Sequence, residues 1–404
     1  MNPSVNLRRN YTELALKIPL TLPLPLAIFT GTICFFLCGS EKFGKPIAIF
    51  LGFLYNNDKW DRPASCFFAE ADTKKQRSVS IMKLGVLTNV IGDTPLKEAL
   101  AYFKGLGIQM VEIGCGGYPG KDHCDPGVLL HDEAKFNEFV KTIEESGLQI
   151  SALSCHGNPV HPNKEIAKQF DDDMHNAVLM AEKLGIHQIN CFSGCPGDCP
   201  TSENPNWVVC AWPNEFCEVV EWQWNEILIP YWKDFVAFAK SHGVNKIALE
   251  MHQGFCVYNT YTLKKLREAV GPEIGANLDP SHLIWQGMDP IKVIRALGGD
   301  AIFHVHAKDT KIDPVNAPID GTLDYRPYGN EIERSWIFRS IGYGHDELFW
   351  KDFVSQLRLV GYDYVLSIEH EDSLMSKNEG LVKACDVLKR SITFEDKMSD
   401  ARWF

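Results

Sequence analysis

Four short segments in the second half of the chain each end in a side chain that could bind a metal ion. They are Ile247-Ala248-Leu249-Glu250, Gly275-Ala276-Asn277-Leu278-Asp279, Ile302-Phe303-His304-Val305-His306 and Val365-Leu366-Ser367-Ile368-Glu369. In each segment an apolar run typical of a buried strand ends in a carboxylate or an imidazole. Carboxylate oxygens with one imidazole suit Mn²⁺, Mg²⁺ or Co²⁺ better than an ion that prefers thiolates. The pattern indicates metal-dependent chemistry on a polar substrate rich in oxygen.

The rest of the sequence predicts a fold that would bring these side chains together. From Lys83 onward, strand-like and helix-like segments alternate, as in a parallel α/β fold. No G-x-G-x-x-G motif follows the first strand, so a closed (β/α)₈ TIM barrel is favoured over a doubly wound sheet. The predicted strands are 83–87, 109–114, 149–155, 187–192, 245–251, 274–279, 301–306 and 364–369. The predicted helices are 96–106, 132–147, 164–184, 218–242, 260–270, 289–297, 347–360 and 377–391.

The barrel places the four metal-type side chains on one face. Consecutive parallel strands deliver their C-terminal ends to the same face, where the active sites of such barrels lie. Glu250, Asp279, His306 and Glu369 would therefore converge there. The long connections 193–217 and 307–346 both follow strands, so we expect them to build or cover the site.

Further imidazoles fall close to the predicted ligands. Side chains alternate along a strand, so His304 and His306, two residues apart, point to the same side. His306 lies nearer the C-terminal end of the strand and is the better ligand. His304 then fills a layer of the barrel or supports a ligand. His252 lies two residues beyond Glu250, and we expect it to contact the substrate.

Two more side chains on this face have two interpretations each. His156, in Cys155-His156-Gly157-Asn158-Pro159, either contacts the substrate or braces the turn that follows the third strand. Lys308 either pairs with Asp309 or holds an oxygen of the substrate.

The ordered set Glu250, Asp279-x-x-His282, His306 and Glu369 resembles the metal site of the sugar phosphate isomerase/epimerase family. These are the xylose-isomerase-like TIM barrels, which include ketose 3-epimerases, hydroxypyruvate isomerase and the inosose enzymes. The resemblance covers about residues 82–391, and it includes Val111-Glu112-Ile113-Gly114 and Gly342-Tyr343-Gly344.

The resemblance implies roles for particular residues. The divalent cation would be bound by Glu250, Asp279, His306 and Glu369. His282 and Arg339 resemble substrate-binding residues of the family. We expect the two glutamates to exchange a proton with a sugar carbon next to a carbonyl, one taking it and the other returning it.

Other segments depart from the simple ketose epimerases. The 307–346 connection is long, and the end of the eighth strand, Ile368-Glu369-His370-Glu371-Asp372, is unusually acidic. These features resemble a branch associated with 3-keto-glycosides and C-glycoside deglycosidases. Isomerisation, epimerisation and elimination begin with the same proton removal, so the sequence leaves all of them open. A non-catalytic sugar-binding barrel also stays open.

Composition excludes some classes of partner. The 404-residue chain has a formal net charge of −12, which argues against binding to a phosphate backbone. An apurinic endonuclease on the same barrel would need a basic groove and more histidine ligands. The 13 cysteines are scattered, as expected for reduced cysteines rather than a disulfide scaffold. The expected partner is a small sugar or sugar derivative; a homo-oligomer or a partner subunit stays open.

Residues 1–81 differ from the rest of the chain. The segment from Ile18 to Cys38 contains no charged residue and is long enough to span a bilayer as a helix. Three prolines within it would interrupt such a helix. We therefore expect residues 1–81 to be either a membrane signal or anchor, or an upstream extension with a natural start at Met82; a folded region is the third and least favoured alternative. In the second case we expect a cytoplasmic protein, and in the first an anchored or exported one. The predicted barrel spans 82–395, with a tail at 396–404.

Overall fold

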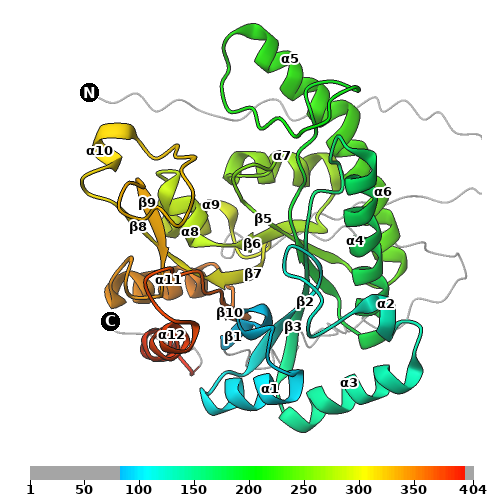
Figure 1. The fold of residues 1–404 in the computed structure, drawn as a ribbon, viewed down its shortest axis with the longest axis vertical. Helices are drawn as coiled ribbons and strands as arrows, with labels where there is room; N and C mark the ends of the chain where they lie inside the picture. The colour runs from blue at the N-terminus through cyan, green and yellow to red at the C-terminus, as the bar shows by residue number, and fades with distance from the viewer. Residues whose placement is uncertain (1–81, 396–404) are drawn as a thin grey trace, which may run out of the picture. The chain divides into compact units, whose positions relative to one another are not determined.

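The computed structural model describes residues 82–395, and within them the chain forms a closed barrel (Figure 1). Eight parallel strands follow one another in the order β1-β10-β7-β6-β5-β4-β3-β2, and β1 pairs with both β10 and β2 to close the ring. The TIM barrel predicted from the sequence is confirmed. The barrel strands are β1 (Lys83–Leu87), β2 (Met110–Gly117), β3 (Gln149–His156), β4 (Gln188–Cys191), β5 (Lys246–Glu250), β6 (Ile274–Leu278), β7 (Ile302–Ala307) and β10 (Val365–Ile368).

Each of the eight predicted strands is present, with ends that differ from the prediction by three residues or fewer. The strands are buried along nearly their whole length, because one face packs into the barrel and the other against helices. A strand buried on both faces reads as a continuous apolar run. This is why polar residues inside such runs, Glu112 among them, stand out.

The helices lie outside the barrel between successive strands (Figure 1). Several begin at side-chain caps, as at Asn163, whose Oδ1 accepts from the backbone N–H of Glu165 at 3.0 Å. Gly185 ends α4 with φ at 69°, a left-handed conformation that glycine adopts without strain. The helices are α1 (Leu96–Gly105), α2 (Pro126–Leu129), α3 (Glu133–Ser146), α4 (Lys164–Leu184), α5 (Asn214–Trp222), α6 (Ile229–Ser241), α7 (Thr260–Val270), α8 (Pro280–Trp285), α9 (Pro290–Leu297), α10 (Ala317–Asp320), α11 (Glu347–Leu359) and α12 (Lys377–Ser391), with a 3₁₀ turn η1 (Thr88–Ile91) and a π-helix η2 (Gln223–Leu228).

The predicted helix 218–242 is wrong in one respect. It is divided into α5, η2 and α6, and α5 begins before the predicted start. At the π-helical turn, the buried Gln223 amide donates to the carbonyls of Gly197 at 2.9 Å and Asn206 at 2.7 Å. A tertiary contact to the preceding long connection therefore accompanies the local change of helix type, and periodicity does not reveal it.

The connection 307–346 is not the plain loop that the sequence indicated. It contains β8 (Asp309–Ile312) and β9 (Trp336–Arg339), which pair antiparallel beside the barrel, with α10 between them. Trp336 stacks on Trp285 of α8, with ring centroids 5.0 Å apart. This contact lies between segments distant in the sequence, so the strand pair was not visible as a pattern.

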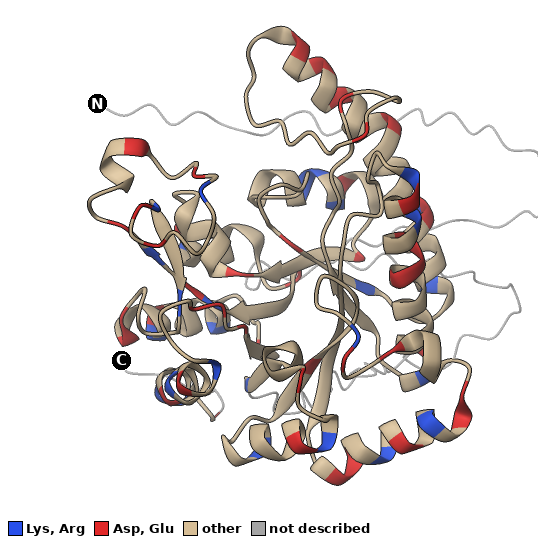
Figure 2. Ribbon diagram, in the orientation of Figure 1, with Lys and Arg blue, Asp and Glu red and all other residues tan. Residues whose placement is uncertain are grey.

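Charged side chains are mixed along the outer helices. Figure 2 shows Lys and Arg beside Asp and Glu on α1, α3 and α4. Some form pairs one turn apart, such as Lys168 and Asp172, whose Nζ and Oδ2 are 2.5 Å apart.

The apolar segment Ile18–Cys38 and the tail 396–404 lie outside the described residues. Among residues 82–395, no helix is long and apolar enough to cross a membrane.

The barrel predicts that residues 82–404 fold without the preceding segment. All eight strands and the cluster at their ends lie within that range. The free energy of unfolding of Met82–Phe404 should match that of the full chain within about 0.5 kcal/mol, measured by urea denaturation. An insoluble truncated chain beside a soluble full chain would contradict this prediction.

Candidate functional site

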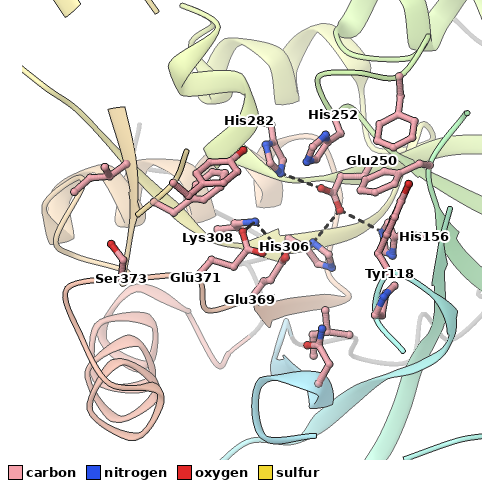
Figure 3. Close-up of a pocket in the computed structure, with 18 residues that line it drawn as sticks. Tyr118, His156, Glu250, His252, His282, His306, Lys308, Glu369, Glu371 and Ser373 are labelled. Atoms are coloured by element: carbon pink, nitrogen blue, oxygen red, sulfur yellow. Dashed lines mark hydrogen bonds and ion pairs between the residues drawn. The ribbon is translucent and has the colours of Figure 1, made fainter. Parts of the chain in front are cut away.

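A cavity of about 560 Å³ lies over the ends of the barrel strands (Figure 3). Its floor is made of carboxylates, imidazoles and one lysine, and its walls are largely aromatic and aliphatic. The polar floor comprises His156, Glu250, His252, His282, His306, Lys308, Glu369 and Glu371.

Four side chains converge at the floor, and three of them, Glu250, His306 and Glu369, line the cavity. Glu250 ends β5, Asp279 follows β6 as the N-cap of α8, His306 lies in β7, and Glu369 follows β10. One ligand-type atom from each lies within 4.8 Å of those of the other three. His306 Nδ1 is 2.8 Å from Glu369 Oε2 and 3.3 Å from Glu250 Oε2. The set predicted from strand ends is therefore brought together in space.

The hydrogen-bonding state of this cluster fits a cation. Asp279 Oδ2 and Glu369 Oε2 are buried and accept no hydrogen bond, although Glu369 Oε2 is only 2.8 Å from His306 Nδ1. Buried carboxylate oxygens without donors are costly unless a positive group satisfies them. Three carboxylates and one imidazole form a donor set that suits a divalent ion.

Glu250 is surrounded by imidazoles. His282 Nε2 is 3.1 Å from its Oε1, and His156 Nε2 is 3.3 Å from its Oε2. Burial alone would raise the pKa of Glu250, but the contacts with His156, His282 and His306 hold it well below its usual range. Burial together with the neighbouring His282 lowers the pKa of His252 to about 3. His252 is therefore neutral at pH 7, and Glu250 is ionised.

A close backbone approach places His156 at this site. Gly117, at the end of β2, has φ at 62°, and a Cβ there would lie 2.0 Å from the carbonyl oxygen of His156. A residue with a side chain would therefore push β3 away at His156. Glycine at this position lets β2 and β3 stay paired up to the cavity.

On the opposite side, Lys308 lies between two acidic residues. Its Nζ is 3.2 Å from Glu369 Oε1 and 2.5 Å from Glu371 Oε2, and it lies 4.2 Å above the Phe338 ring. Burial would raise the pKa of Glu369, but the charges of Lys308 and His306 lower it to about 2. Both glutamates of the cluster are thus ionised; they share His306 as a partner and differ in the others.

Asp279 has a different electrostatic environment. Burial is the largest effect on it and raises its pKa to about 6, against the opposing charges of His282 and Lys308. His282 Nε2 lies 3.4 Å from Asp279 Oδ2, as the Asp-x-x-His spacing allows.

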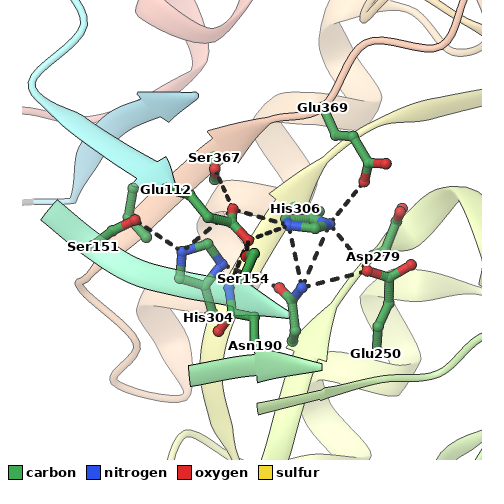
Figure 4. Close-up of polar contacts among 12 residues, drawn as sticks. Glu112, Ser151, Ser154, Asn190, Glu250, Asp279, His304, His306, Ser367 and Glu369 are labelled. Atoms are coloured by element: carbon green, nitrogen blue, oxygen red, sulfur yellow. Dashed lines mark hydrogen bonds and ion pairs between the residues drawn. The ribbon is translucent and has the colours of Figure 1, made fainter. Parts of the chain in front are cut away.

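Glu112 is a further residue of the site to which sequence analysis gave no role. It lies in β2 with no exposed surface, and both of its oxygens are 3.0 Å from His306 Nε2 (Figure 4). Burial would raise its pKa, but His306 and His304 hold the pKa well below its usual range. The available signal was a lone carboxylate inside the apolar run Met110–Gly117.

The remaining predicted residues divide into two groups. His156, His252, His282 and Lys308 line the cavity, as expected for substrate contacts. Arg339 is not among the lining residues: its Nε donates to Asp372 Oδ2 at 3.1 Å, and its guanidinium lies 5.5 Å from the Tyr343 ring.

The upper wall of the cavity is aromatic. Phe192 and Phe255 stack with ring centroids 4.3 Å apart, and Phe338 stacks on Tyr328 at 5.7 Å. Tyr118 stands at the mouth, with 62% of its surface exposed. The long connections border or supply part of this wall, because Phe192 directly precedes the first and Tyr328 and Phe338 belong to the second.

Comparison with known proteins gives the family. The family described as "Xylose isomerase-like TIM barrel" matches residues 100–391. The chain belongs to this family. The uncharacterized protein YfiH of Bacillus subtilis (strain 168) is 37% identical over 314 residues, which cover 77% of this chain and 100% of that protein.

Solved structures share the fold at low sequence identity. A D-tagatose 3-epimerase-like protein is 19% identical with a TM-score of 0.52, covering 77% of this chain and 97% of its own. The IOLI protein, whose structure has a zinc atom, is 18% identical with a TM-score of 0.53, covering 77% and 100%. A xylose isomerase domain protein from Planctomyces limnophilus is 19% identical with a TM-score of 0.51, covering 77% and 96%.

The site predicts that Lys308→Met destabilises the metal-free protein. Methionine is close to lysine in length, but it removes the ammonium group that lies over the Phe338 ring and leaves Glu369 without its lysine partner. Removing one partner of a buried ion pair costs about 3–5 kcal/mol, and we expect about 3 kcal/mol because Glu371 is half exposed. Urea denaturation at pH 7 measures the change. Lys311→Met, at an exposed position of β8, is the control and should change stability by less than about 0.5 kcal/mol.

Proposed function

We propose that this chain is a divalent-metal-dependent sugar isomerase or epimerase that transfers a proton next to a carbonyl through an enediolate. The observation that carries the proposal is the convergence of two ionised glutamates with Asp279 and His306, because three of the four, Glu250, His306 and Glu369, line one cavity. Membership of the xylose isomerase-like family and the fold shared with a D-tagatose 3-epimerase-like protein support it.

The cation would be held by Glu250, Asp279, His306 and Glu369. Bound there, a divalent ion supplies Lewis-acid polarisation of a carbonyl oxygen, which acidifies the adjacent C–H. The oxygen-rich donor set favours Mn²⁺, Mg²⁺ or Co²⁺. The zinc atom in the IOLI protein adds Zn²⁺ to the ions that a binding experiment should include.

Glu250 and Glu369 are the proposed acid/base pair. Glu250 ends β5 and Glu369 follows β10. His306 lowers the pKa of both, His156 and His282 act in addition on Glu250, and Lys308 acts in addition on Glu369. One carboxylate takes the proton from the sugar carbon, and the other returns it from the opposite side. His156 and His282 contact Glu250 and can help to carry its proton.

Substrate oxygens are assigned to the remaining polar side chains of the floor. We assign sugar hydroxyl and carbonyl contacts to His156, His252, His282 and Lys308, which line the cavity beside the ligand cluster. Neutral His252 can donate or accept a hydrogen bond, and Lys308 donates only. The substrate role of Arg339 stays a prediction.

A second candidate function is elimination from a 3-keto-glycoside. The cavity volume of about 560 Å³ lies within the range of about 300–1,000 Å³ typical of sites for drug-sized ligands. The aromatic wall above the polar floor would suit an apolar group attached to the sugar. The same carboxylate would remove the proton, and the bond to the leaving group β to the carbanion would then break.

A non-catalytic sugar-binding barrel is the alternative from another class of protein. It would bind a sugar without exchanging the proton at any carbon. Incubation of the protein with ketoses and 3-keto-glucosides in D₂O distinguishes the candidate functions. Deuterium in the sugar is measured by mass spectrometry, and by NMR once the cation has been removed from the sample. The carbon that gains deuterium identifies the reaction, and the absence of exchange with every sugar that binds would favour the non-catalytic alternative.

The proposed site predicts that Asp279→Asn strongly weakens cation binding. The amide keeps the size of the side chain but removes one negative charge from the cluster. His306→Ala should have a similar effect, because it removes the imidazole ligand. Titration with Mn²⁺ and metal analysis of the purified proteins measure this. Wild-type stoichiometry and affinity in both variants would rule the site out.

The pH dependence of the same titration is its internal control. Burial raises the pKa of Asp279 to about 6, and the pKa of His306 is well above its usual value because the attraction of Glu112 and Glu369 outweighs burial. A cation binds only the deprotonated ligands, so both protons must leave. Affinity should therefore rise with pH through about 6 as Asp279 loses its proton, and rise further above the ordinary histidine pKa of 6.5 as His306 loses its proton, with proton release.

Glu250→Gln and Glu369→Gln should each lose most turnover while the protein stays folded. Loss of a general acid or base costs about 10²–10⁴-fold in rate. The substitution also removes a negatively charged ligand of the cation, which lowers the rate further. The turnover rate of each variant is measured with the substrate that the D₂O experiment identifies. Circular dichroism of each variant shows whether it is folded. A variant that still exchanges the substrate proton but makes no product identifies the carboxylate that returns the proton.

Glu371→Gln provides the matched control. Glu371 lines the cavity and contacts Lys308, but it does not belong to the ligand cluster. It should keep most of the turnover. Near-wild-type turnover in either Glu250→Gln or Glu369→Gln would contradict the proposed acid/base pair.

A further inference from the structure

A buried polar network lies beneath the ligand cluster, with Glu112 at its centre (Figure 4). Glu112 Oε1 and Oε2 are each 3.0 Å from His306 Nε2. The other ring nitrogen, His306 Nδ1, faces the carboxylates of Glu250 and Glu369 instead. The ring of His306 thus lies between acidic groups at both nitrogens.

Glu112 is held in place by hydrogen-bond donors from three other strands. Asn190 Nδ2 of β4 donates to its Oε1 at 2.8 Å, and Ser367 Oγ of β10 donates to its Oε2 at 2.7 Å. Ser154 Oγ of β3 also donates to Oε1. Every one of these contacts uses Glu112 as an acceptor, as an ionised carboxylate requires.

This arrangement fixes the proton of the neutral His306 ring. A lone pair on Nε2 would face two carboxylate oxygens at 3.0 Å, whereas an N–H there donates to them. With the proton on Nε2, the lone pair of the neutral ring is on Nδ1, the atom that faces the ligand carboxylates.

We propose that Glu112 is a positioning residue, which keeps the His306 proton on Nε2 and so presents the Nδ1 lone pair to the cation. The inference rests on the proposed metal site and adds a residue to it. Glu112 itself does not reach the cavity, since it is absent from the lining residues. Its action passes through the orientation and the tautomer of one ligand.

A second cation beside Glu112 is the alternative that the geometry raises. Glu112, His304 and His306 also bring ligand-type atoms within 4.8 Å of one another. The donors around them oppose this use: three side chains already donate to Glu112, and His304 Nε2 lies 3.2 Å from Ser151 Oγ. The number of bound cations separates the two interpretations.

The test is Mn²⁺ titration of the full chain with Glu112→Gln. Glutamine keeps the size of the side chain but removes the charge that holds the Nε2 proton. Loss of such a supporting partner typically costs about 10–100-fold in metal affinity, so we expect that decrease with one cation still bound. Circular dichroism and the unfolding transition of the metal-free variant monitor its fold.

Asp309→Asn is the matched control. Asp309 is a fully buried carboxylate that also contacts an imidazole, with Oδ1 2.8 Å from His345 Nδ1, but it belongs to none of the ligand clusters. The same change from carboxylate to amide should leave Mn²⁺ affinity within about threefold of wild type. If Glu112→Gln does not fold, Ser154→Ala, which removes one donor to Glu112, should weaken binding by a smaller factor.

A spectroscopic measurement reports the tautomer directly. In the Co²⁺-loaded protein, the Nε2–H of a histidine bound through Nδ1 gives a hyperfine-shifted proton signal that exchanges with solvent. We expect this signal in the wild type, its loss in His306→Gln, and faster exchange in Glu112→Gln. A merely structural role of Glu112 would not change the exchange rate of this proton.

The outcomes separate the inference from the function on which it rests. A wild type that binds no divalent cation overturns the metal site, and the role of Glu112 with it. Equal affinity and equal proton exchange in wild type and Glu112→Gln overturn the role of Glu112 alone. Two cations in the wild type and one in Glu112→Gln would make Glu112 a ligand and also overturn the inference.

Discussion

The compensation of buried negative charge is the constraint on which the centre of this barrel depends. Glu112, Glu250, Asp279 and Glu369 all lie inside or at the end of the barrel, three of them with 3% or less of their surface exposed. Ionised carboxylates are expensive to remove from water unless partners with positive charge or hydrogen-bond donors surround them. The barrel meets this need with imidazoles around Glu250, with Lys308 beside Glu369, and with serine and asparagine donors around Glu112.

The negative charges are not compensated to the same degree, and the carboxylates with the fewest donors are those of the proposed cation site. Glu112 has donors for both oxygens, whereas Asp279 Oδ2 accepts no hydrogen bond and Glu369 Oε2 faces Nδ1 of His306, itself a candidate ligand atom. A site left incomplete by its own side chains can accept a positive ligand, whereas the completed network beneath it stays rigid. His306 joins the two parts, because one ring nitrogen faces each of them.

The walls of the cavity follow a different principle from its floor. Aromatic side chains from the segments after β4 and β5 and from the 307–346 connection stand above the charged groups, so the interior is polar at the bottom and apolar near the mouth. Apolar walls limit the access of water and strengthen electrostatic interactions at the floor.

The sequence by itself determined the barrel and the candidate metal ligands, because both follow from local order along the chain. Eight apolar runs separated by helical patterns indicate parallel strands, and parallel strands place residues such as Glu250 and Glu369 on one face wherever they occur. Only the tertiary structure decided which residues support those ligands. The contact of Glu112 with His306 joins positions 194 residues apart, and the β8–β9 pair is packed on Trp285 from another helix. Arg339 shows the same limit, since its position before Gly342 did not reveal that Asp372 would hold its side chain away from the cavity lining. Such contacts depend on distances across the folded barrel, and these leave no periodicity or spacing in a single sequence.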